Sequence, residues 1–185
     1  MTELLEVRWH GRGGLGAVTS AELLARAAAS QGGYSQSFPS FGPERRGAPV
    51  VAFLRISDEF IRTRTGIRTP DAVVVIDPRL LRVVDVTAGL KDEGKIIINS
   101  VKTPEQLKAD FGYKWPVASV DATRIARETI GLPITNTAMI GAFLKIYGVV
   151  EIDSLRQELE ERFGARAAAN LTALERAYNE VVIKE

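Results

Sequence analysis

Residues 4–30 read LLEVRWHGRGGLGAVTSAELLARAAAS and join a strand pattern directly to a helix pattern. Residues 4–9 carry apolar, β-branched and aromatic side chains, which are typical of a strand. A glycine cluster follows at residues 11–16, and residues 17–30 are mostly alanine and leucine, which favour a helix. This order of strand, glycine turn and helix predicts the first unit of an α/β fold.

Three further stretches continue this pattern along the chain. Residues 71–76 and 95–99 contain unbroken runs of valine and isoleucine, which are typical of strands covered by helices on both faces. Residues 117–121 form a shorter example, and a helix pattern over residues 103–111 precedes it. The alternation predicts a Rossmann-like, doubly wound α/β fold with a mainly parallel sheet and right-handed crossovers.

The remaining segments predict an antiparallel hairpin and a helical C-terminus. We expect further strands at residues 34–38, 50–56 and 60–65, the last two forming the hairpin. After residue 121 we expect only helices, at residues 122–130, 137–147, 152–163 and 165–182. Because 185 residues without a repeat or linker suit one core, we expect a single domain over residues 1–185.

The composition limits the chemistry that the chain can perform. It contains no cysteine, which excludes disulfides, a cysteine nucleophile and an iron–sulfur cluster held by its own thiolates. A single histidine, His10, argues against a metal site, and no residue is assigned as catalytic. The net charge of +1 would attract neither nucleic acid nor an anionic membrane. We expect a cytoplasmic protein without a signal peptide or a membrane-spanning helix.

The pattern Gly11-x-Gly13-x-x-Gly16 is suited to binding an anion. Glycines let backbone N–H groups approach a phosphate, the helix N-terminus adds unpaired donors, and Arg12 adds a full charge. The alternative is that the glycines only make a tight turn. Nicotinamide dinucleotides are disfavoured, because residues 36–38 (QSF) offer no acid to hold a ribose at the end of the second strand.

A long loop at residues 38–49 is rich in proline and glycine and carries Arg45 and Arg46. Its stiffness suggests a contact surface in which the two arginines grip a phosphate or a carboxylate. The alternative is a rigid connection with solvated arginines.

Several other polar residues have two interpretations. His10 either reaches a ligand or is a strand-end histidine held by a backbone bond, and we favour the second. Asp77 followed by Pro78 is typical of a helix N-cap, as is Asn136 with Thr137. A group of arginines around the hairpin forms either a solvated face or a docking surface for an acidic partner. The group comprises Arg55, Arg62, Arg64 and Arg68.

Four stretches, taken in order, resemble the gamma subunits of pyruvate (2-oxoacid):ferredoxin oxidoreductases. They are HGRGGLGAVTSAELLARAA, SFPSFGPERRGAPVVAF, PDAVVVIDPRLL and NTAMIGAF, of which SFGPERRGAP is the most specific. The resemblance spans most of residues 7–145. It implies a hetero-oligomeric thiamine diphosphate enzyme that converts a 2-oxoacid and coenzyme A into acyl-CoA and CO2 and reduces ferredoxin. This chain would be one of its subunits and inactive alone.

The same resemblance divides the cofactors among the subunits. It implies thiamine diphosphate and Mg2+ on the alpha and beta subunits and iron–sulfur clusters on a ferredoxin-like delta subunit. Coenzyme A would contact the gamma subunit, with its phosphates at Gly11, Arg12, Gly13, Gly14 and Gly16. Arg45 and Arg46 are weaker candidates for that site and could equally face the alpha or beta subunit.

The sequence leaves the 2-oxoacid and two alternative functions open. Pyruvate is the preferred 2-oxoacid, while 2-oxoisovalerate, 2-oxoglutarate and indolepyruvate stay open. A free-standing nucleotide-binding or coenzyme A-binding regulatory module would use the same glycine turn for another purpose. A structural adaptor would bind partners without needing the turn at all.

Overall fold

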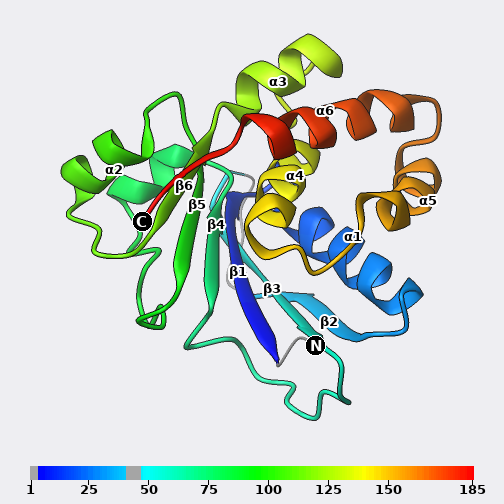
Figure 1. Cartoon of the computed structure of the whole chain (residues 1–185), viewed down its shortest axis with the longest axis horizontal. Coiled ribbons are helices and arrows are strands. Elements are labelled where there is room, and N and C mark those ends of the chain that lie inside the picture. Colours follow the sequence, from blue (N-terminus) through cyan, green and yellow to red (C-terminus); the bar gives the residue numbers. More distant parts are fainter. Residues whose placement is uncertain (1–3, 41–46) are drawn as a thin grey trace.

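The computed structural model describes residues 4–40 and 47–185. A mixed sheet of seven strands runs through it in the order β2-β3-β1-β4-β5-β6-β7 (Figure 1). The strands are β1 (Leu5–Arg12), β2 (Tyr34–Pro39), β3 (Pro49–Ser57), β4 (Ala72–Val75), β5 (Lys95–Asn99), β6 (Val117–Val120) and β7 (Val182–Lys184). The α-helices are α1 (Ala17–Ser30), α2 (Pro104–Phe111), α3 (Ala122–Thr129), α4 (Asn136–Tyr147), α5 (Ile152–Phe163) and α6 (Ala167–Glu180). Two short 3-10 helices are η1 (Pro78–Arg82) and η2 (Gly164–Arg166).

The central strands are parallel, as the sequence predicts. β4 lies between β1 and β5, β6 lies beside β5, and all three pairings are parallel. These four strands therefore end at the same edge of the sheet. Residues 73–75 and 96–98 are completely buried, as strands covered on both faces must be. The predicted α/β class is confirmed: the core of the sheet is parallel, antiparallel strands flank it on both sides, and most of the C-terminal part is helical.

Two hydrophobic cores lie on opposite faces of the sheet. The larger core contains residues of α1, α4, α5 and α6, and Figure 1 shows these helices together on one side of the molecule. Trp9 of β1 is fully buried in it, with its ring centroid 5.6 Å from that of Phe143 in α4. The smaller core packs Leu107 of α2 against valine and isoleucine side chains of β4 and β5. No helix in residues 4–40 and 47–185 is long and apolar enough to cross a membrane.

The backbones of α4 and α6 approach each other closely at Gly141. A Cβ atom at this position would overlap the carbonyl oxygen of Leu174 and lie 2.8 Å from its carbonyl carbon. Only glycine fits between the two helices at this distance. The motif NTAMIGAF therefore contains a residue that the packing of the larger core requires.

The antiparallel hairpin does not use the strands that the sequence predicts. β3 pairs with β2 on one side and with β1 on the other, both antiparallel. Both edges of β3 are therefore occupied, so residues 60–65 cannot pair with β3 as the predicted hairpin requires. They run as an irregular segment instead, with Ile61 buried and Phe60 exposed. The alternating pattern of that segment was misleading, because it does not reveal whether a partner strand has a free edge.

The C-terminal end of the chain is not entirely helical, contrary to the prediction. The predicted helix over residues 165–182 ends at Glu180, and Val182–Lys184 forms β7, which pairs antiparallel with β6. β-Branched Val181, Val182 and Ile183 favour an extended chain, and β6 offers them a free edge. The helix predicted after Asp77 is limited to the five residues of η1.

Candidate functional site

The glycine turn begins later than the sequence pattern suggests. β1 continues through Gly11 and Arg12, which pair with residues 50 and 49 of β3. The turn proper is therefore residues 13–16. Within it, the N–H of Gly13 donates to the carbonyl of Ala48 at 3.1 Å, and the N–H of Leu15 donates to the carbonyl of Arg12 at 3.0 Å. The protein itself thus uses two of the donors that a ligand might have taken.

The first turn of α1 supplies donors that remain. Gly16 is the N-cap, no side chain caps the helix, and its first turn contains no acidic residue. The N–H of Ser20 donates to the carbonyl of Gly16 at 2.9 Å, so the backbone donors of Ala17, Val18 and Thr19 precede the first intrahelical bond. Such an uncapped helix N-terminus favours an anion through both its free N–H groups and its dipole.

Packing requires two of the glycines, while the third lies in open space. A Cβ on Gly11 would lie 3.0 Å from the Cβ of Ala17, so Gly11 allows the strand to pass close to the helix. Gly16 has a φ of 84°, and a Cβ there would lie 2.9 Å from the Cβ of Asn136. Gly14 has a φ of 91° and no atom within 4 Å of such a Cβ. Gly11 and Gly16 are thus required by packing, whereas the space around Gly14 is open to a ligand.

Arg12 is held beside the turn by a buried carboxylate. Its Nε donates to Asp77 at 2.9 Å, and one terminal nitrogen donates to the carbonyl of Gly47 at 2.9 Å. Asp77 also accepts bonds from the backbone N–H and the guanidinium of Arg79. Burial by itself would raise the pKa of Asp77, but the bonds from Arg79 and Arg12 outweigh it and hold the pKa below its usual value. Two arginines thus share one carboxylate, which leaves a net positive charge beside the turn.

Asp77 confirms one sequence interpretation and adds a role that was missed. It caps η1, with Pro78 at the first helical position, as predicted. Its bond to Arg12 joins residues 65 positions apart in the sequence. No local pattern predicted this bond, because it depends on β1 and β4 being neighbouring parallel strands whose ends lie at one edge of the sheet.

A chain of hydrogen bonds extends from the glycine turn across this edge. The N–H of Ile76 donates to the carbonyl of His10 at 2.8 Å. The side-chain amide of Asn99 donates to the carbonyl of Ile76 and accepts from the N–H of Thr123 in α3. Asn99 is buried, and no sequence motif pointed to it. The ends of β1, β4 and β5 and the start of α3 are therefore fixed relative to one another.

The position of β2 adds a physical reason against a nicotinamide dinucleotide. In the nicotinamide-binding fold the second strand lies next to the first, and the acid at its end holds the ribose. Here β3 lies between β1 and β2. The end of β2 is one strand too far from the turn.

His10 lies on the other face of β1 from the larger core and is buried, with 4% of its surface exposed. Burial, with a smaller effect of the Arg8 charge, lowers its pKa to about 4. Among the described residues its buried Nε2 has no hydrogen-bond partner. The backbone of His10 is bonded, but the part of the chain that the structure describes brings no second catalytic group to its side chain.

This burial predicts how stability depends on pH. The unfolded chain binds a proton at His10 near pH 6.5, whereas the folded chain does so only near pH 4. Stability is therefore lost as the pH falls through this window, by about 3 kcal/mol in total. We expect His10→Leu to remove this loss, measured by urea unfolding between pH 7 and 4. Asp77 does not interfere, because its contribution is lost only below its usual pKa of 3.8. Parallel stability curves for the two proteins would contradict the depressed pKa.

The other predicted residues have mixed outcomes. Arg45 and Arg46 lie outside the described residues. Arg55 is not solvated: it is buried, with its Nε 2.8 Å from Glu6 and its guanidinium over the ring of Phe38. The other arginines of that group, Arg62, Arg64 and Arg68, are exposed.

Asn136 is the first residue of α4 and not its cap. The N-cap is Thr135, without a side-chain bond. Asn136 is buried, because Gly16 packs against its side chain. Thr137 instead donates to the side chain of Asn170 in α6. The two residues therefore join helices.

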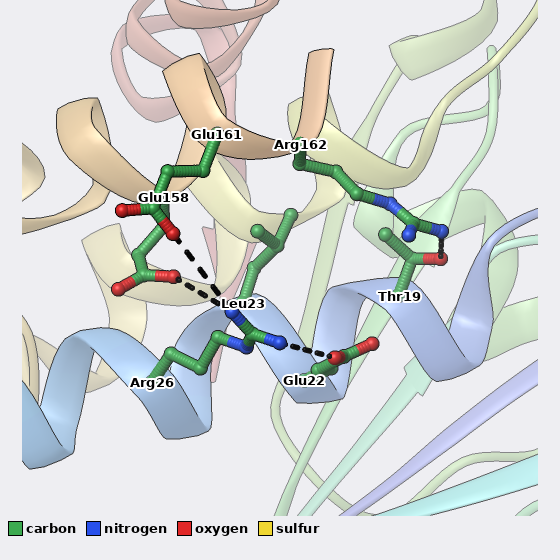
Figure 2. A pocket seen from close by; sticks show the side chains of 7 residues that line it. All are labelled: Thr19, Glu22, Leu23, Arg26, Glu158, Glu161 and Arg162. Atoms are coloured by element: carbon green, nitrogen blue, oxygen red, sulfur yellow. Dashed lines mark hydrogen bonds and ion pairs between the residues drawn. The ribbon is translucent and has the colours of Figure 1, made fainter.

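Three cavities lined by described residues lie away from the glycine turn. One of about 200 Å³ separates α1 from α5, and Figure 2 shows Arg26 crossing it. Arg26 pairs there with Glu22 at 3.1 Å and with Glu158 at 3.9 Å. Arg26 and these glutamates in the cavity are therefore already ion-paired with one another.

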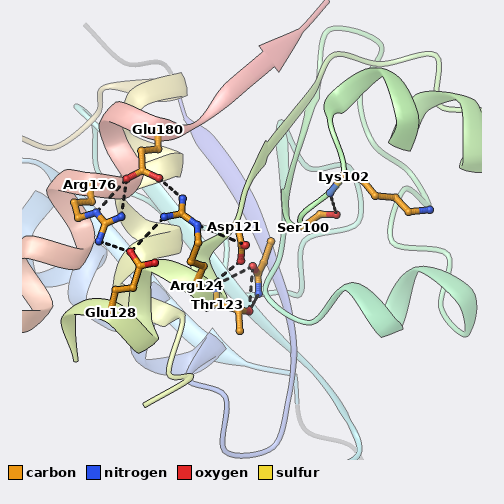
Figure 3. Close-up of polar contacts among 9 residues, drawn as sticks. Ser100, Lys102, Asp121, Thr123, Arg124, Glu128, Arg176 and Glu180 are labelled. Carbon is orange, nitrogen blue, oxygen red and sulfur yellow. Dashed lines mark hydrogen bonds and ion pairs between the residues drawn. The ribbon is translucent and has the colours of Figure 1, made fainter. Parts of the chain in front are cut away.

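The other two cavities, of about 500 and 410 Å³, share residues at the ends of β5 and β6. The shared residues are Ser100, Val101, Lys102, Asp121 and Arg124. We call these two cavities together the β5–β6 groove. Figure 3 shows the ion pairs that form one wall of it, in which Arg124 and Arg176 are joined through Glu128 and Glu180.

Comparisons with known proteins show which family the chain resembles over almost its full length. Residues 6–180 match the family model described as pyruvate ferredoxin/flavodoxin oxidoreductase. The common gamma subunit of the pyruvate/ketoisovalerate oxidoreductases of Thermococcus kodakarensis is 52% identical, over 98% of this chain and 100% of that protein. The pyruvate synthase subunit PorC of Methanothermobacter thermautotrophicus is 50% identical, over 96% of both chains.

A solved structure agrees with the sequence relatives. The crystal structure of the pyruvate oxidoreductase subunit PORC from Thermotoga maritima superposes with a TM-score of 0.88 over 100% of both chains, at 38% sequence identity. The arrangement of strands and helices around the glycine turn is thus similar to that of a protein from this group.

Proposed function

The chain belongs to the pyruvate ferredoxin/flavodoxin oxidoreductase family, and from this premise we propose that its own task is to bind the phosphates of coenzyme A. It is a gamma subunit of a 2-oxoacid:ferredoxin oxidoreductase, and its relatives are subunits of pyruvate synthase and related enzymes. It is therefore part of an enzyme and not an enzyme by itself. Its contribution to the reaction has to come from binding and positioning.

One observation carries the proposal: an uncapped helix N-terminus lies beside an arginine that a buried aspartate holds in place. The donors of Ala17–Thr19 and the charge of Arg12 lie on either side of the turn, and no acidic residue in the first turn of α1 opposes an anion. Open space at Gly14 admits a ligand to the backbone. A diphosphate, with two negative charges and several acceptor oxygens, fits this set of donors.

The partners follow from the chemistry that this chain lacks. Without cysteine it has no thiolates for an iron–sulfur cluster, so a ferredoxin-like delta subunit would supply the electron path. Alpha and beta subunits would hold thiamine diphosphate and Mg2+ and form the pocket for the 2-oxoacid. Arg45 and Arg46 remain candidates for contacts with coenzyme A or with those subunits.

Pyruvate is the proposed 2-oxoacid, with 2-oxoisovalerate as the second candidate. The relative from Thermococcus kodakarensis is named as a subunit common to pyruvate and ketoisovalerate oxidoreductases. A shared gamma subunit fits a role in binding coenzyme A, because that substrate is the same in both reactions. Selection of the 2-oxoacid then belongs to the other subunits.

The test compares two glycines of equal geometry. Gly14 and Gly32 have φ values of 91° and 85°, and at neither position would an added Cβ have an atom within 4 Å. We expect Gly14→Asp to raise the KM for coenzyme A about tenfold in the complex reconstituted with alpha, beta and delta subunits, because a carboxylate at the turn repels the phosphates. Gly32→Asp, at the other end of α1, should leave it unchanged.

Two outcomes would contradict the proposal. Equal KM values for the two variants would show that the turn does not meet coenzyme A, and would favour a structural adaptor. Oxidation of 2-oxoacids by the lone chain would remove the subunit role altogether. Calorimetry of the isolated chain against coenzyme A, NAD and ATP separates the free-standing module from both.

A further inference from the structure

Residues 58–69 join the end of β3 to the start of β4 and lie at the edge of the sheet opposite the glycine turn. Leu5, the first residue of β1, pairs with Ile56, so β3 ends beside the start of β1. β4 starts at the same edge, because it is parallel to β1. Figure 1 shows this segment along the lower edge of the molecule. The eight residues of β1 separate it from the glycine turn by about 25 Å.

The segment is irregular but is held against the sheet by buried contacts. Ile61 and Ile67 are 6% and 3% exposed. The carbonyl of Ile61 accepts a hydrogen bond from the side-chain amide of Gln36 in β2 at 3.2 Å. A Cβ at Gly66 would lie 3.3 Å from the ring of Phe53 in β3. The exposed side chains between these anchors therefore project from a backbone that is fixed in position.

The segment covers the face of β2 and β3 that points away from α1. Ser35 donates to the carbonyl of Ala25 in α1 at 2.6 Å, so Ser35 faces that helix. Side chains alternate between the two faces along a strand, which places Tyr34 and Gln36 on the other face. The segment is therefore the outer layer of the molecule at this place, and its exposed side chains are open to a partner.

Two aromatic rings are exposed together on this layer. Phe60 is 63% exposed and Tyr34 is 46% exposed. Their ring centroids lie 5.8 Å apart at an interplanar angle of 85°, an edge-to-face contact. Leu4, which precedes β1 at the same edge of the sheet, is 40% exposed. Single exposed apolar residues are normal on a protein surface, but a group of them on a fixed backbone indicates a contact surface.

Exposed arginines follow Phe60 in the same segment. They are Arg62, Arg64 and Arg68, and none of them forms an ion pair with a residue in the described ranges 4–40 and 47–185. Two acidic residues, Asp58 and Glu59, precede Phe60. The three arginines and two acids give residues 58–69 a net charge of +1, and all of the charge beyond Phe60 is positive.

We propose that this surface docks against an acidic surface of another subunit of the oxidoreductase. The docking surface comprises Leu4, Tyr34, Phe60, Arg62 and Arg64, and we call it the aromatic–arginine surface. Aromatic residues and arginine are enriched in protein–protein interfaces. Phe60 enters an apolar pocket of the partner, and Arg62 and Arg64 pair with carboxylates around that pocket. The net charge of +1 over the whole chain makes a nucleic acid or an anionic membrane a poorer partner.

The position of this surface allows the chain to meet two different neighbours. Membership of the family already makes the chain one subunit among several. The glycine turn and the aromatic–arginine surface lie at opposite edges of the sheet, so one can bind a ligand while the other contacts a partner. The docking proposal therefore does not depend on the binding of coenzyme A.

The first test measures how tightly the full chain joins the complex of the other subunits. Arg62→Glu is expected to weaken this affinity about tenfold at low ionic strength, and less at high salt, because salt screens the charge pairs. Phe60→Ala should weaken it about tenfold at either ionic strength, because it removes an apolar anchor. Arg166→Glu, which reverses an exposed arginine of η2, is the matched control. Affinities of all three variants equal to that of the wild-type chain would overturn the proposal.

The second test identifies the partner by cross-linking. A photoreactive benzoyl group placed on the ring at position 60 should, on irradiation of the assembled complex, join this chain to one other subunit. The cross-linked peptide of that subunit should be rich in aspartate and glutamate. A cross-link to a second copy of this chain, to a peptide without acidic residues, or to no protein would overturn the proposal.

The two proposals fail in different ways. When an excess of the chain saturates the complex, Arg62→Glu should have the wild-type KM for coenzyme A, whereas Gly14→Asp should join the complex with wild-type affinity. A raised KM in the saturated Arg62→Glu complex would overturn the docking assignment. A normal KM in Gly14→Asp would contradict the glycine turn alone and leave the aromatic–arginine surface in place.

Discussion

Gly141→Ala is expected to lower the free energy of unfolding by about 3 kcal/mol. The added Cβ would overlap the carbonyl oxygen of Leu174, and a backbone atom cannot rotate away as a side chain can. α4 and α6 would have to separate within the larger core, where Asn170 and Thr137 are also hydrogen-bonded between them. The gain of up to about 1 kcal/mol from the helix propensity of alanine does not offset this.

The measurement is thermal and urea unfolding of the full chain, with an expected fall in Tm of about 10 °C. Gly112→Ala is the matched control, because a Cβ at Gly112 meets no atom within 4 Å, although its φ is 66°. It should cost only the strain of a left-handed alanine, about 1 kcal/mol. Leu174→Ala should not rescue Gly141→Ala, since the overlap involves the backbone of Leu174. A stability within about 1 kcal/mol of wild type would refute the close approach of α4 and α6.

Local patterns were sufficient where a segment's structure depends on its own residues. The strand at residues 95–99 and the helix at residues 152–163 have the predicted bounds, because a buried apolar run and an amphipathic spacing are both properties of neighbouring residues. The order of strand, glycine turn and helix was predicted correctly, although the turn itself begins two residues later, at Gly13. Its parallel neighbours followed from the alternation of strands and helices along the chain.

Predictions failed where the outcome depends on distant partners. Residues 60–65 alternate like a strand, but both edges of β3 were already taken by β1 and β2. β7 forms because β6 has a free edge, which no local pattern around Val182 reveals. The link between Arg12 and Asp77 and the buried position of Asn99 depend in the same way on which strand ends meet. The groove could not be predicted because its lining comes from segments that are far apart in the sequence.

Arg12→Glu is expected to raise the KM for coenzyme A about 100-fold in the reconstituted complex. Arg12 contributes a charged donor beside the turn, and losing such a bond to phosphate costs about tenfold or more. The new carboxylate adds repulsion of the phosphates, and it also faces the buried Asp77, which loses one of its two arginine partners. Arg12→Lys keeps the charge but not the planar guanidinium held by Asp77 and Gly47, so a smaller effect is expected.

A structural defect and a binding defect can be told apart by the step at which coenzyme A enters. Release of CO2 from the 2-oxoacid in a single turnover without coenzyme A should proceed at the wild-type rate in Arg12→Glu, because the turn is not needed there. If that step falls with the rest, the variant has disturbed assembly, and the 100-fold effect says nothing about phosphates. Asp77→Asn provides a second comparison. It keeps the positive charge of Arg12 but removes the carboxylate that positions it, so it should raise the KM for coenzyme A less than Arg12→Glu does. Arg156→Glu, a reversal on an exposed face of α5, should change neither step. An Arg12→Glu complex with normal KM would show that the positive charge at the turn serves another purpose.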